Sequence, residues 1–353
     1  MADVALPTTG PSFRAHPGRV RALAAAAVVI ALASAWVTDA FSAAGLSNFM
    51  VVFSSLLIGA IPLVMLGAFV AACIGTFVPE SAFARIGRLP EPMQIPVAGL
   101  AGFAFPVCEC GSVPVARRLV QRGLIPSAAV TFMLAAPILN PIVVLSTAVA
   151  YRGRDVFWPM VLGRVGLGFL VAMAVGWVVG ARDRSGFLRP GPHDHEHHDD
   201  SCDCGHHDAG HVHDHTHDDG SKPSRFFGYF AGDFVFMGRF LILGAAVAAA
   251  LQTLVPQSVL GGVADTPVVS LLAMMALAFA LSLCSESDAF VAASFVQFGV
   301  GPQLAFLVFG PMMDSKLVFL YNATFSKGFV RTVLVVVAGV TLVGTLWVEV
   351  LFG

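Results

Sequence analysis

Two short segments combine cysteine with acidic side chains inside an apolar chain. The first spans Cys108–Ser112 (CECGS) and the second spans Cys284–Asp288 (CSESD). Soft thiolate ligands prefer soft ions such as trivalent arsenic, Cu⁺ or Cd²⁺. Carboxylates at membrane depth take up protons, coordinate cations or pair with bases. These chemistries predict a solute-binding site, and its candidate residues are Cys108, Glu109, Cys110, Ser112, Asn140, Cys284, Glu286, Asp288, Asp314 and Lys316.

The alternative for these residues is structural. Free cysteines pack well between close helices, and buried acids can pair with Arg164, Arg239 or Lys316 and so fix the helix packing. Asn140, flanked by two prolines, could bind a polar solute or satisfy the backbone freed by the break.

The composition predicts a membrane protein. The chain has 353 residues, of which 57% are hydrophobic and 12% charged, and its mean hydropathy is +0.81. A soluble domain has about twice that charged share, and a spanning helix needs roughly 17–25 apolar residues. Charge is absent from six runs, 22–38, 123–151, 165–181, 240–264, 266–285 and 332–348. We therefore expect an all-α polytopic membrane protein that does not bind nucleic acid.

The two motif segments belong to an internal repeat. Leu66-Gly67-Ala68 matches Leu243-Gly244-Ala245 at a shift of 177 residues. Cys108 matches Cys284 at a shift of 176 residues, and Asn140 matches Asp314 after a two-residue gap. Self-similarity at a fixed spacing indicates a duplicated structural unit. The solute site should lie where the two units meet.

The distribution of Lys and Arg predicts that the repeat is inverted. If each motif segment were a full crossing, the basic loop residues would divide 9 to 8 between the two faces; if each segment dips in and returns, they divide 15 to 2. The positive-inside rule favours the second arrangement. It gives a leading helix and two units of three crossings with opposite orientations. The resulting regions are 1–48 (cytoplasmic N-terminus and first helix), 49–181 (first repeat), 182–224 (cytoplasmic loop) and 225–353 (second repeat).

Each motif segment should contain a broken or re-entrant helix. Pro106, Gly111 and Pro114 predict the break in the first segment, and Gly299 to Pro302 close the second. Residues two apart on a regular helix point to nearly opposite sides, whereas in an extended break they share a side. Joint binding by the two thiols of the first motif therefore requires that they lie within the break. For the leading helix, a cleaved signal peptide is the alternative to an uncleaved span.

The loop 182–224 holds 10 of the 11 histidines. Tracts rich in His and Cys bind Zn, Ni, Co or Cu, which predicts metal buffering or sensing; the alternative is a solvated linker with incidental histidines. No cofactor is expected to be required. The metal-ligand candidates are His193, His195, His197, His198, Cys202, Cys204, His206, His207, His211, His213, His215 and His217.

The motifs resemble a known family. The stretch Cys108–Ala116 (CECGSVPVA), with Phe132–Pro141 (FMLAAPILNP), resembles the ArsP/YraQ-like predicted permeases, and so do Leu283–Phe290 (LCSESDAF) and Gly310–Lys316 (GPMMDSK). The resemblance implies a multi-pass permease of the plasma membrane. Characterised relatives export trivalent organoarsenicals, and many others have no known substrate. The histidine-rich loop is not expected across the family and favours a metal ion for this member.

Four functional hypotheses follow. The first is a permease that exports a soft metal or metalloid species, driven by a gradient or by a separate subunit. The second is a divalent metal transporter for Zn, Co or Ni with the loop as collector. The third is a membrane thiol oxidoreductase that uses Cys108 and Cys110 as a redox pair. The fourth is a structural subunit of a larger complex. The expected partners are the lipid bilayer and a small inorganic or organometalloid solute, with an accessory subunit or a homo-oligomer left open.

Overall fold

The computed structural model describes residues 42–78, 90–104, 107–180, 222–254 and 267–352, and every element in these residues is a helix. The predicted first helix and the metal-ligand candidates from His193 to His217 lie outside the described residues. The helices are α2 (Ala43–Phe77), α4 (Glu91–Ala101), η1 (Gly102–Ala104), α5 (Glu109–Gln121), α6 (Pro126–Leu139), α7 (Pro141–Ala150), α8 (Phe157–Gly180), α9 (Lys222–Leu254), α10 (Pro267–Leu281), α11 (Asp288–Ser294), α12 (Val300–Phe309), α13 (Ser315–Thr324) and α14 (Lys327–Phe352).

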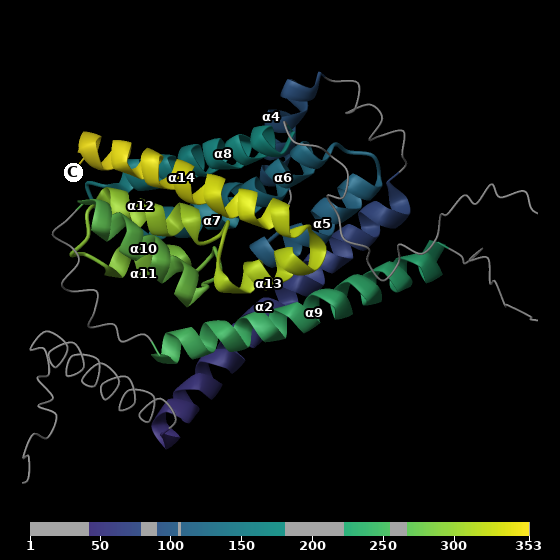
Figure 1. Cartoon of the computed structure of the whole chain (residues 1–353), viewed down its shortest axis with the longest axis horizontal. Helices are drawn as coiled ribbons and strands as arrows, with labels where there is room; N and C mark the ends of the chain where they lie inside the picture. The colour runs from purple at the N-terminus through teal and green to yellow at the C-terminus, as the bar shows by residue number, and fades with distance from the viewer. Residues whose placement is uncertain (1–41, 79–89, 105–106, 181–221, 255–266, 353) are drawn as a thin grey trace, which may run out of the picture.

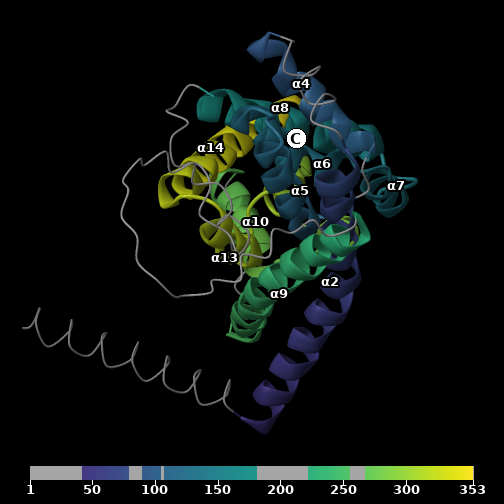
Figure 2. The same cartoon turned by 90° about the vertical axis from the view of Figure 1, so that its right-hand side faces the viewer.

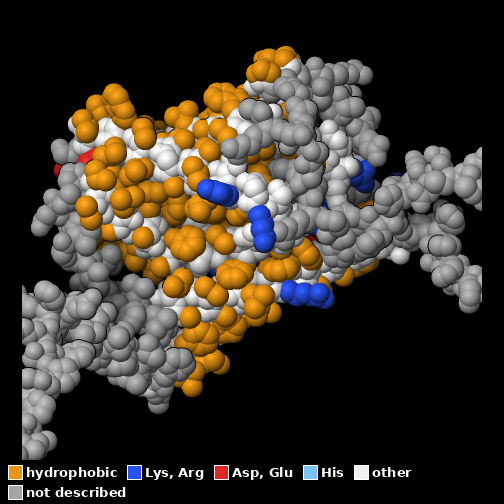
Figure 3. All heavy atoms as spheres, viewed as in Figure 1, with side chains coloured by type: hydrophobic (Ala, Val, Ile, Leu, Met, Phe, Trp, Pro, Cys, Tyr) orange, Lys and Arg blue, Asp and Glu red, His pale blue; other side chains and the backbone are white. Residues whose placement is uncertain are grey.

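Long apolar helices make up most of the molecule. Five spans in the described residues are long and apolar enough to cross a membrane, namely Gly45–Phe77, Pro126–Ala150, Phe157–Gly180, Lys222–Thr253 and Lys327–Leu351. Hydrophobic side chains cover much of the face seen in Figure 3. Because a bilayer cannot hydrogen-bond the backbone, helices satisfy these groups internally. The predicted all-α polytopic membrane fold is confirmed.

The helices follow one another in the same order in both halves. The series α2, α4, α5, α6, α7, α8 has its counterpart in α9, α10, α11, α12, α13, α14. In Figure 1 the pair α4 and α5 lies toward one end of the molecule, and the pair α10 and α11 lies toward the other end. The long helices α2 and α9 also run in opposite directions, since Asn48 near the start of α2 donates to Thr253 near the end of α9 at 3.5 Å. The two units therefore have opposite orientations, as the distribution of basic residues predicts.

One span in each half is broken at the position of the matched polar residue. Asn140 separates α6 from α7, and its side chain accepts a hydrogen bond from the Ile142 amide at 3.0 Å. Asp314 precedes α13 and accepts from the Leu317 amide at 2.7 Å. Both side chains satisfy amides that a new helix start leaves free. The matched pair thus has the same structural role in both repeats.

The break in the first motif segment lies earlier than the sequence predicts. Val107 and Cys108 are non-helical, and α5 begins at Glu109, so Gly111 and Pro114 lie inside the helix. The Cys108 sulfur accepts from the Gly111 amide at 3.3 Å and caps this helix start. Cys110 is therefore helical and does not lie in an extended break with Cys108. That part of the prediction is wrong, because the cysteine itself serves as the N-cap.

Two glycines matched by the repeat allow α2 and α9 to approach the site helices closely. A Cβ added at Gly67 of α2 would overlap the backbone of Gly111 in α5, 2.8 Å from its carbonyl oxygen. A Cβ added at Gly244 of α9 would lie 2.7 Å from the Cα of Lys316 in α13. Small residues let helix backbones come together in membranes. The α2/α9 pair, seen side by side in Figure 2, thus packs directly on the starts of α5 and α13.

Candidate solute-binding site

Four helices start within the interior, where the two repeats meet. They are α5, α7, α11 and α13, and the packing of α5 on α13 and of α7 on α11 joins the repeats. A helix N-terminus carries free amides and a partial positive charge, which favours carboxylates. Glu109 is the first residue of α5, Asp288 is the first of α11, and Asp314 caps α13. The helix starts therefore explain why these acids are placed here.

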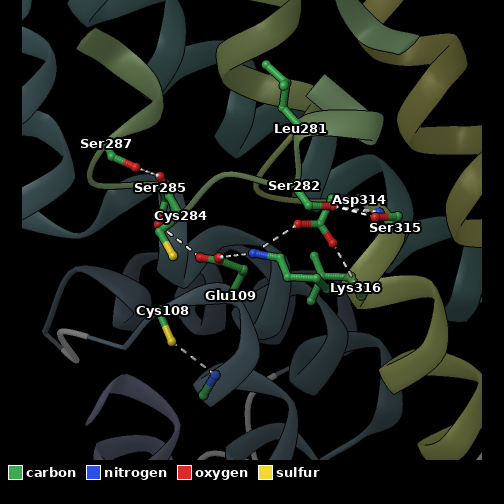
Figure 4. Close-up of polar contacts among 12 residues, drawn as sticks. Cys108, Glu109, Leu281, Ser282, Cys284, Ser285, Ser287, Asp314, Ser315 and Lys316 are labelled. Carbon is green, nitrogen blue, oxygen red and sulfur yellow. Dashed lines mark hydrogen bonds and ion pairs between the residues drawn. The ribbon is translucent and has the colours of Figure 1, made fainter. Parts of the chain in front are cut away.

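Glu109, Lys316 and Asp314 form a buried charge cluster across the repeat boundary (Figure 4). The Lys316 Nζ lies 3.8 Å from Oε1 of Glu109 and 3.5 Å from Oδ2 of Asp314. The other oxygen of Glu109, Oε2, accepts a hydrogen bond from the Ser285 hydroxyl at 3.1 Å. All four residues are buried. Lys316 and Ser285 of the second repeat thus both contact the Glu109 carboxylate of the first repeat.

Ser282 ties the break in the second motif segment to α13. It has a positive φ of 47°, a left-handed conformation that is uncommon for a residue with a Cβ. Its hydroxyl lies 2.6 Å from the hydroxyl of Ser315 and accepts from the Ser315 amide at 3.1 Å. Such backbone outliers persist where the surrounding contacts determine them. These contacts fix the end of α10 against the start of α13, which carries the Lys316 ammonium and the Asp314 carboxylate.

A second buried charge pair lies on the α7/α11 side. The Arg164 guanidinium is 2.7 Å from Oδ2 of Asp288, and it also donates to the Thr147 hydroxyl at 2.9 Å and to the Ser285 carbonyl at 3.1 Å. Arg164 is 1% exposed. Ser285 therefore contacts both charge pairs, with its hydroxyl on Glu109 and its carbonyl on Arg164. The two pairs form one polar network through the interior.

The thiols lie beside this network, but they do not form a metal site in this structure. Cys108 and Cys284 come from different repeats and lie on the same side of Glu109 (Figure 4), and both are free, as is Cys110. Among the described residues, no group of three or more His, Cys, Asp or Glu side chains is placed to hold a metal ion. The three candidate cysteines, Cys108, Cys110 and Cys284, are thus not placed together as a metal site here.

Burial differs between the two sides of the site. Cys108, Glu109 and Cys110 are each at most 4% exposed, whereas Cys284 and Glu286 are only half-buried. Three carboxylate oxygens are buried without a hydrogen-bond partner, namely Oε2 of Glu286, Oδ1 of Asp288 and Oδ2 of Asp314. Buried acceptors without partners are rare. The oxygens of Glu286 and Asp288 are available to a cation or a proton, whereas Oδ2 of Asp314 already lies 3.5 Å from the Lys316 ammonium.

The structure brings together most, but not all, of the predicted site residues. Glu109, Asp314 and Lys316 are in direct contact, and Asp288 joins them through Ser285 and Arg164. Ser112 does not point into this network, since its hydroxyl donates to the Glu109 carbonyl one turn back in its own helix at 2.9 Å. Asn140 caps α7.

Sequence reasoning missed three hydroxyl residues, Ser282, Ser285 and Thr147. Ser285 lies inside the second motif, between the candidates Cys284 and Glu286, and this position could have indicated its role in the site. Thr147 carries no such signal.

Comparison with known proteins shows which family this chain is similar to. Residues 45–349 match a family described as predicted permeases. The UPF0718 protein YcgR of Bacillus subtilis (strain 168) is 38% identical over 300 residues, which is 84% of this chain and 96% of the relative. A Streptococcus mutans protein, provisionally named a two-component membrane permease complex subunit, is 32% identical over 283 residues, 80% of this chain and 88% of the relative. No solved structure matches. The chain therefore belongs to the ArsP family of predicted permeases.

Proposed function

We propose that this permease exports a soft metal or metalloid species, such as a trivalent organoarsenical, across the plasma membrane. The observation that carries the proposal is the placement of two thiols from different repeats beside the Glu109–Lys316–Asp314 cluster. Sulfur ligands select soft ions, and intramembrane ionisable groups commonly mark solute and proton paths. We place the N-terminus and the loop 182–224 on the cytoplasmic side, as the positive-inside rule favours.

The site residues have distinct roles in this proposal. Cys108 and Cys284 bind the soft atom of the solute. Glu286, which has a buried free oxygen, and Asp314 compensate its charge or exchange it for protons. Because no three ligands are in place together in the described residues, the solute itself would draw the two thiols together. Binding at the repeat interface is typical of secondary transporters built from inverted repeats.

A divalent metal ion is the second candidate solute. It is favoured by the ten histidines of the loop 182–224, which could collect Zn, Co or Ni next to the start of α9. By its name, the Streptococcus mutans relative belongs to a two-component complex. An accessory subunit is therefore part of this proposal, and it could supply the energy or deliver the ion.

The test is accumulation of methylarsenite, zinc, cobalt, nickel and copper in cells that express the wild type or a Cys108→Ser, Cys284→Ser double variant. Cys73→Ser is the matched control, since Cys73 lies on α2 outside the charge network. The proposal expects one species to be lowered by the wild type and by the control, but not by the double variant. Equal accumulation in all strains for every species would overturn it.

Deletion of residues 193–217 separates the two candidate solutes. For a divalent metal collected by the loop, the deletion should abolish the effect. For an organoarsenical bound by thiols alone, it should leave the effect unchanged. A disulfide between Cys108 and Cys110 that forms and breaks in step with activity would instead support the oxidoreductase hypothesis.

A further inference from the structure

The packing of the α2/α9 pair breaks the symmetry of the repeat. α2 packs on α5, and α9 packs on α13. If each helix is replaced by its counterpart in the other repeat, these contacts become α9 on α11 and α2 on α7. No comparable packing joins those helices in the described part of the chain. The other outer pair, α8 and α14, is asymmetric as well, because α8 packs on α12 while α14 does not pack comparably on α6.

The glycine contacts define the two equivalent surfaces residue by residue. Gly67 packs on Gly111, and Gly244 packs on the backbone of Lys316. The repeat shifts of 176 and 174 residues carry Gly111 onto Ser287 and Lys316 onto Ile142. Gly111 and Lys316 are buried, whereas Ser287 is exposed and Ile142 is 55% exposed. The α2/α9 pair thus covers one of two matched surfaces and leaves the other open.

Polar contacts at one end of the molecule hold the covered arrangement. Arg118 of α5 forms two hydrogen bonds with Asp233 of α9, at 3.2 and 3.3 Å, and its guanidinium lies over the Tyr229 ring at 4.1 Å. Arg122 donates to the carbonyls of Gly75 and Val78 at the end of α2. Side-chain contacts of this kind can break and re-form, unlike a continuous apolar core. They tie α5 to both members of the pair.

The covered side is also the sealed side of the site. Cys108 and Glu109, at the start of α5, are 3% and 2% exposed. Cys284 and Glu286, just before α11, are partly open. Because the repeats are inverted, the α5 and α11 sides lead to opposite faces of the membrane. The position of the α2/α9 pair therefore determines from which face of the membrane the site is accessible.

We propose that the α2/α9 pair is the moving element of this permease and alternates between the α5/α13 surface and the α7/α11 surface. In the second state Gly67 lies on Ile142 and Gly244 lies on Ser287, so that Cys284 is sealed and Cys108 is open to the opposite face. The proposal rests on the function proposed above, and it names the part of the protein that gives the site alternating access.

The test measures thiol labelling by a membrane-impermeant methanethiosulfonate, applied to either face of membrane vesicles. Two backgrounds keep only Cys108 or only Cys284, with the other five cysteines replaced by serine. The proposal expects Cys284 to react from one face and Cys108 from the opposite face. Ile142→Trp, at an exposed site, should block the second state and slow Cys108 labelling at least roughly tenfold, in proportion to the population lost. Cys284 labelling should not slow.

Val335→Trp is the matched control, since Val335 is 62% exposed on α14 and lies outside both surfaces. It should change neither rate. Asp233→Asn, which removes the carboxylate that holds Arg118, should act in the opposite direction and speed Cys108 labelling.

Two results would overturn the proposal. One is reaction of Cys108 and Cys284 from the same face, and the other is a Cys108 rate that Ile142→Trp leaves unchanged in protein that folds normally. Labelling that alternates as expected without any effect on solute accumulation would support the movement and reject only the proposed solute.

Discussion

Each buried carboxylate of the site has a specific electrostatic partner. Glu109 contacts Ser285 and Lys316, Asp314 contacts Lys316, and Asp288 contacts Arg164. All three acids also lie at helix starts, where the free amides favour negative charge. A buried ion pair adds little stability overall, but removing one partner leaves an uncompensated charge. Single substitutions should therefore be more harmful than paired ones.

The Arg164–Asp288 pair offers the clearest test of this difference. Arg164→Met alone and Asp288→Asn alone should each lower the free energy of unfolding by about 3–5 kcal/mol, because each leaves a buried unpaired group. The double variant should lose much less than the sum. Unfolding of the wild type, the two single variants and the double variant in detergent, followed by circular dichroism, completes a double-mutant cycle. Additive losses would show that the two side chains do not depend on each other.

Ser285 and Ser287 differ in burial although they are two residues apart. Ser285→Ala removes the donor to Glu109 and should cost about 1.5–3 kcal/mol, the usual contribution of a hydrogen bond to a charged group. Ser287 is exposed, and its hydroxyl donates to the nearby Cys284 carbonyl. Ser287→Ala should stay within about 0.5 kcal/mol of the wild type. Equal losses in the same unfolding assay would contradict the role assigned to Ser285.

At the scale of the elements, helix breaks and glycines together position the site. The breaks at Asn140 and Asp314 create the starts of α7 and α13 in the interior. The close approaches at Gly67 and Gly244 then bring α2 and α9 onto α5 and α13. A helix interior normally disfavours glycine, so the matched glycines are explained by contact with a neighbouring backbone.

Alanine at the two contact glycines should therefore be destabilising. Gly67→Ala and Gly244→Ala force atoms into the backbones of Gly111 and Lys316 and should each cost about 1–3 kcal/mol. Gly59 on α2 and Gly238 on α9 have nothing within 4 Å of an added Cβ. Gly59→Ala and Gly238→Ala should be neutral or stabilise by up to about 1 kcal/mol. Thermal unfolding of the four variants makes the comparison, and similar losses at all four sites would refute the contact argument.

At the scale of the whole molecule, the two halves are inverted relative to each other, with α4 and α5 toward one end and α10 and α11 toward the other (Figure 1). The permease family and the five apolar spans establish a multi-pass membrane protein. The site lies between the two halves, where the starts of α5 and α13 and of α7 and α11 meet.

Surface labelling tests this topology directly. Lys222, Lys327 and Arg152 are exposed at the ends of α9, α14 and α7. As single cysteines in a background without the native ones, positions 222 and 327 should react with an impermeant maleimide from one face and position 152 from the other. If the motif segments crossed the membrane fully, position 327 would instead react together with position 152.

Much of this architecture could be predicted from the sequence. Runs without charge predict membrane helices because lipid excludes charge. The positions of Asn140 and Asp314, which the repeat aligns, mark equivalent helix breaks in the two halves. The family follows from motifs that are local in sequence. These features depend on residue type and spacing, which the chain carries by itself.

Only the tertiary structure decided the contacts of the site and its asymmetry. The helical position of Cys110 depends on the cap made by Cys108, and the role of Ser285 depends on packing between the repeats. The sequence repeat describes two equivalent units, and it does not show which of two equivalent surfaces the α2/α9 pair covers. That choice is a balance of long-range contacts, such as Arg118 with Asp233, between residues far apart in the chain.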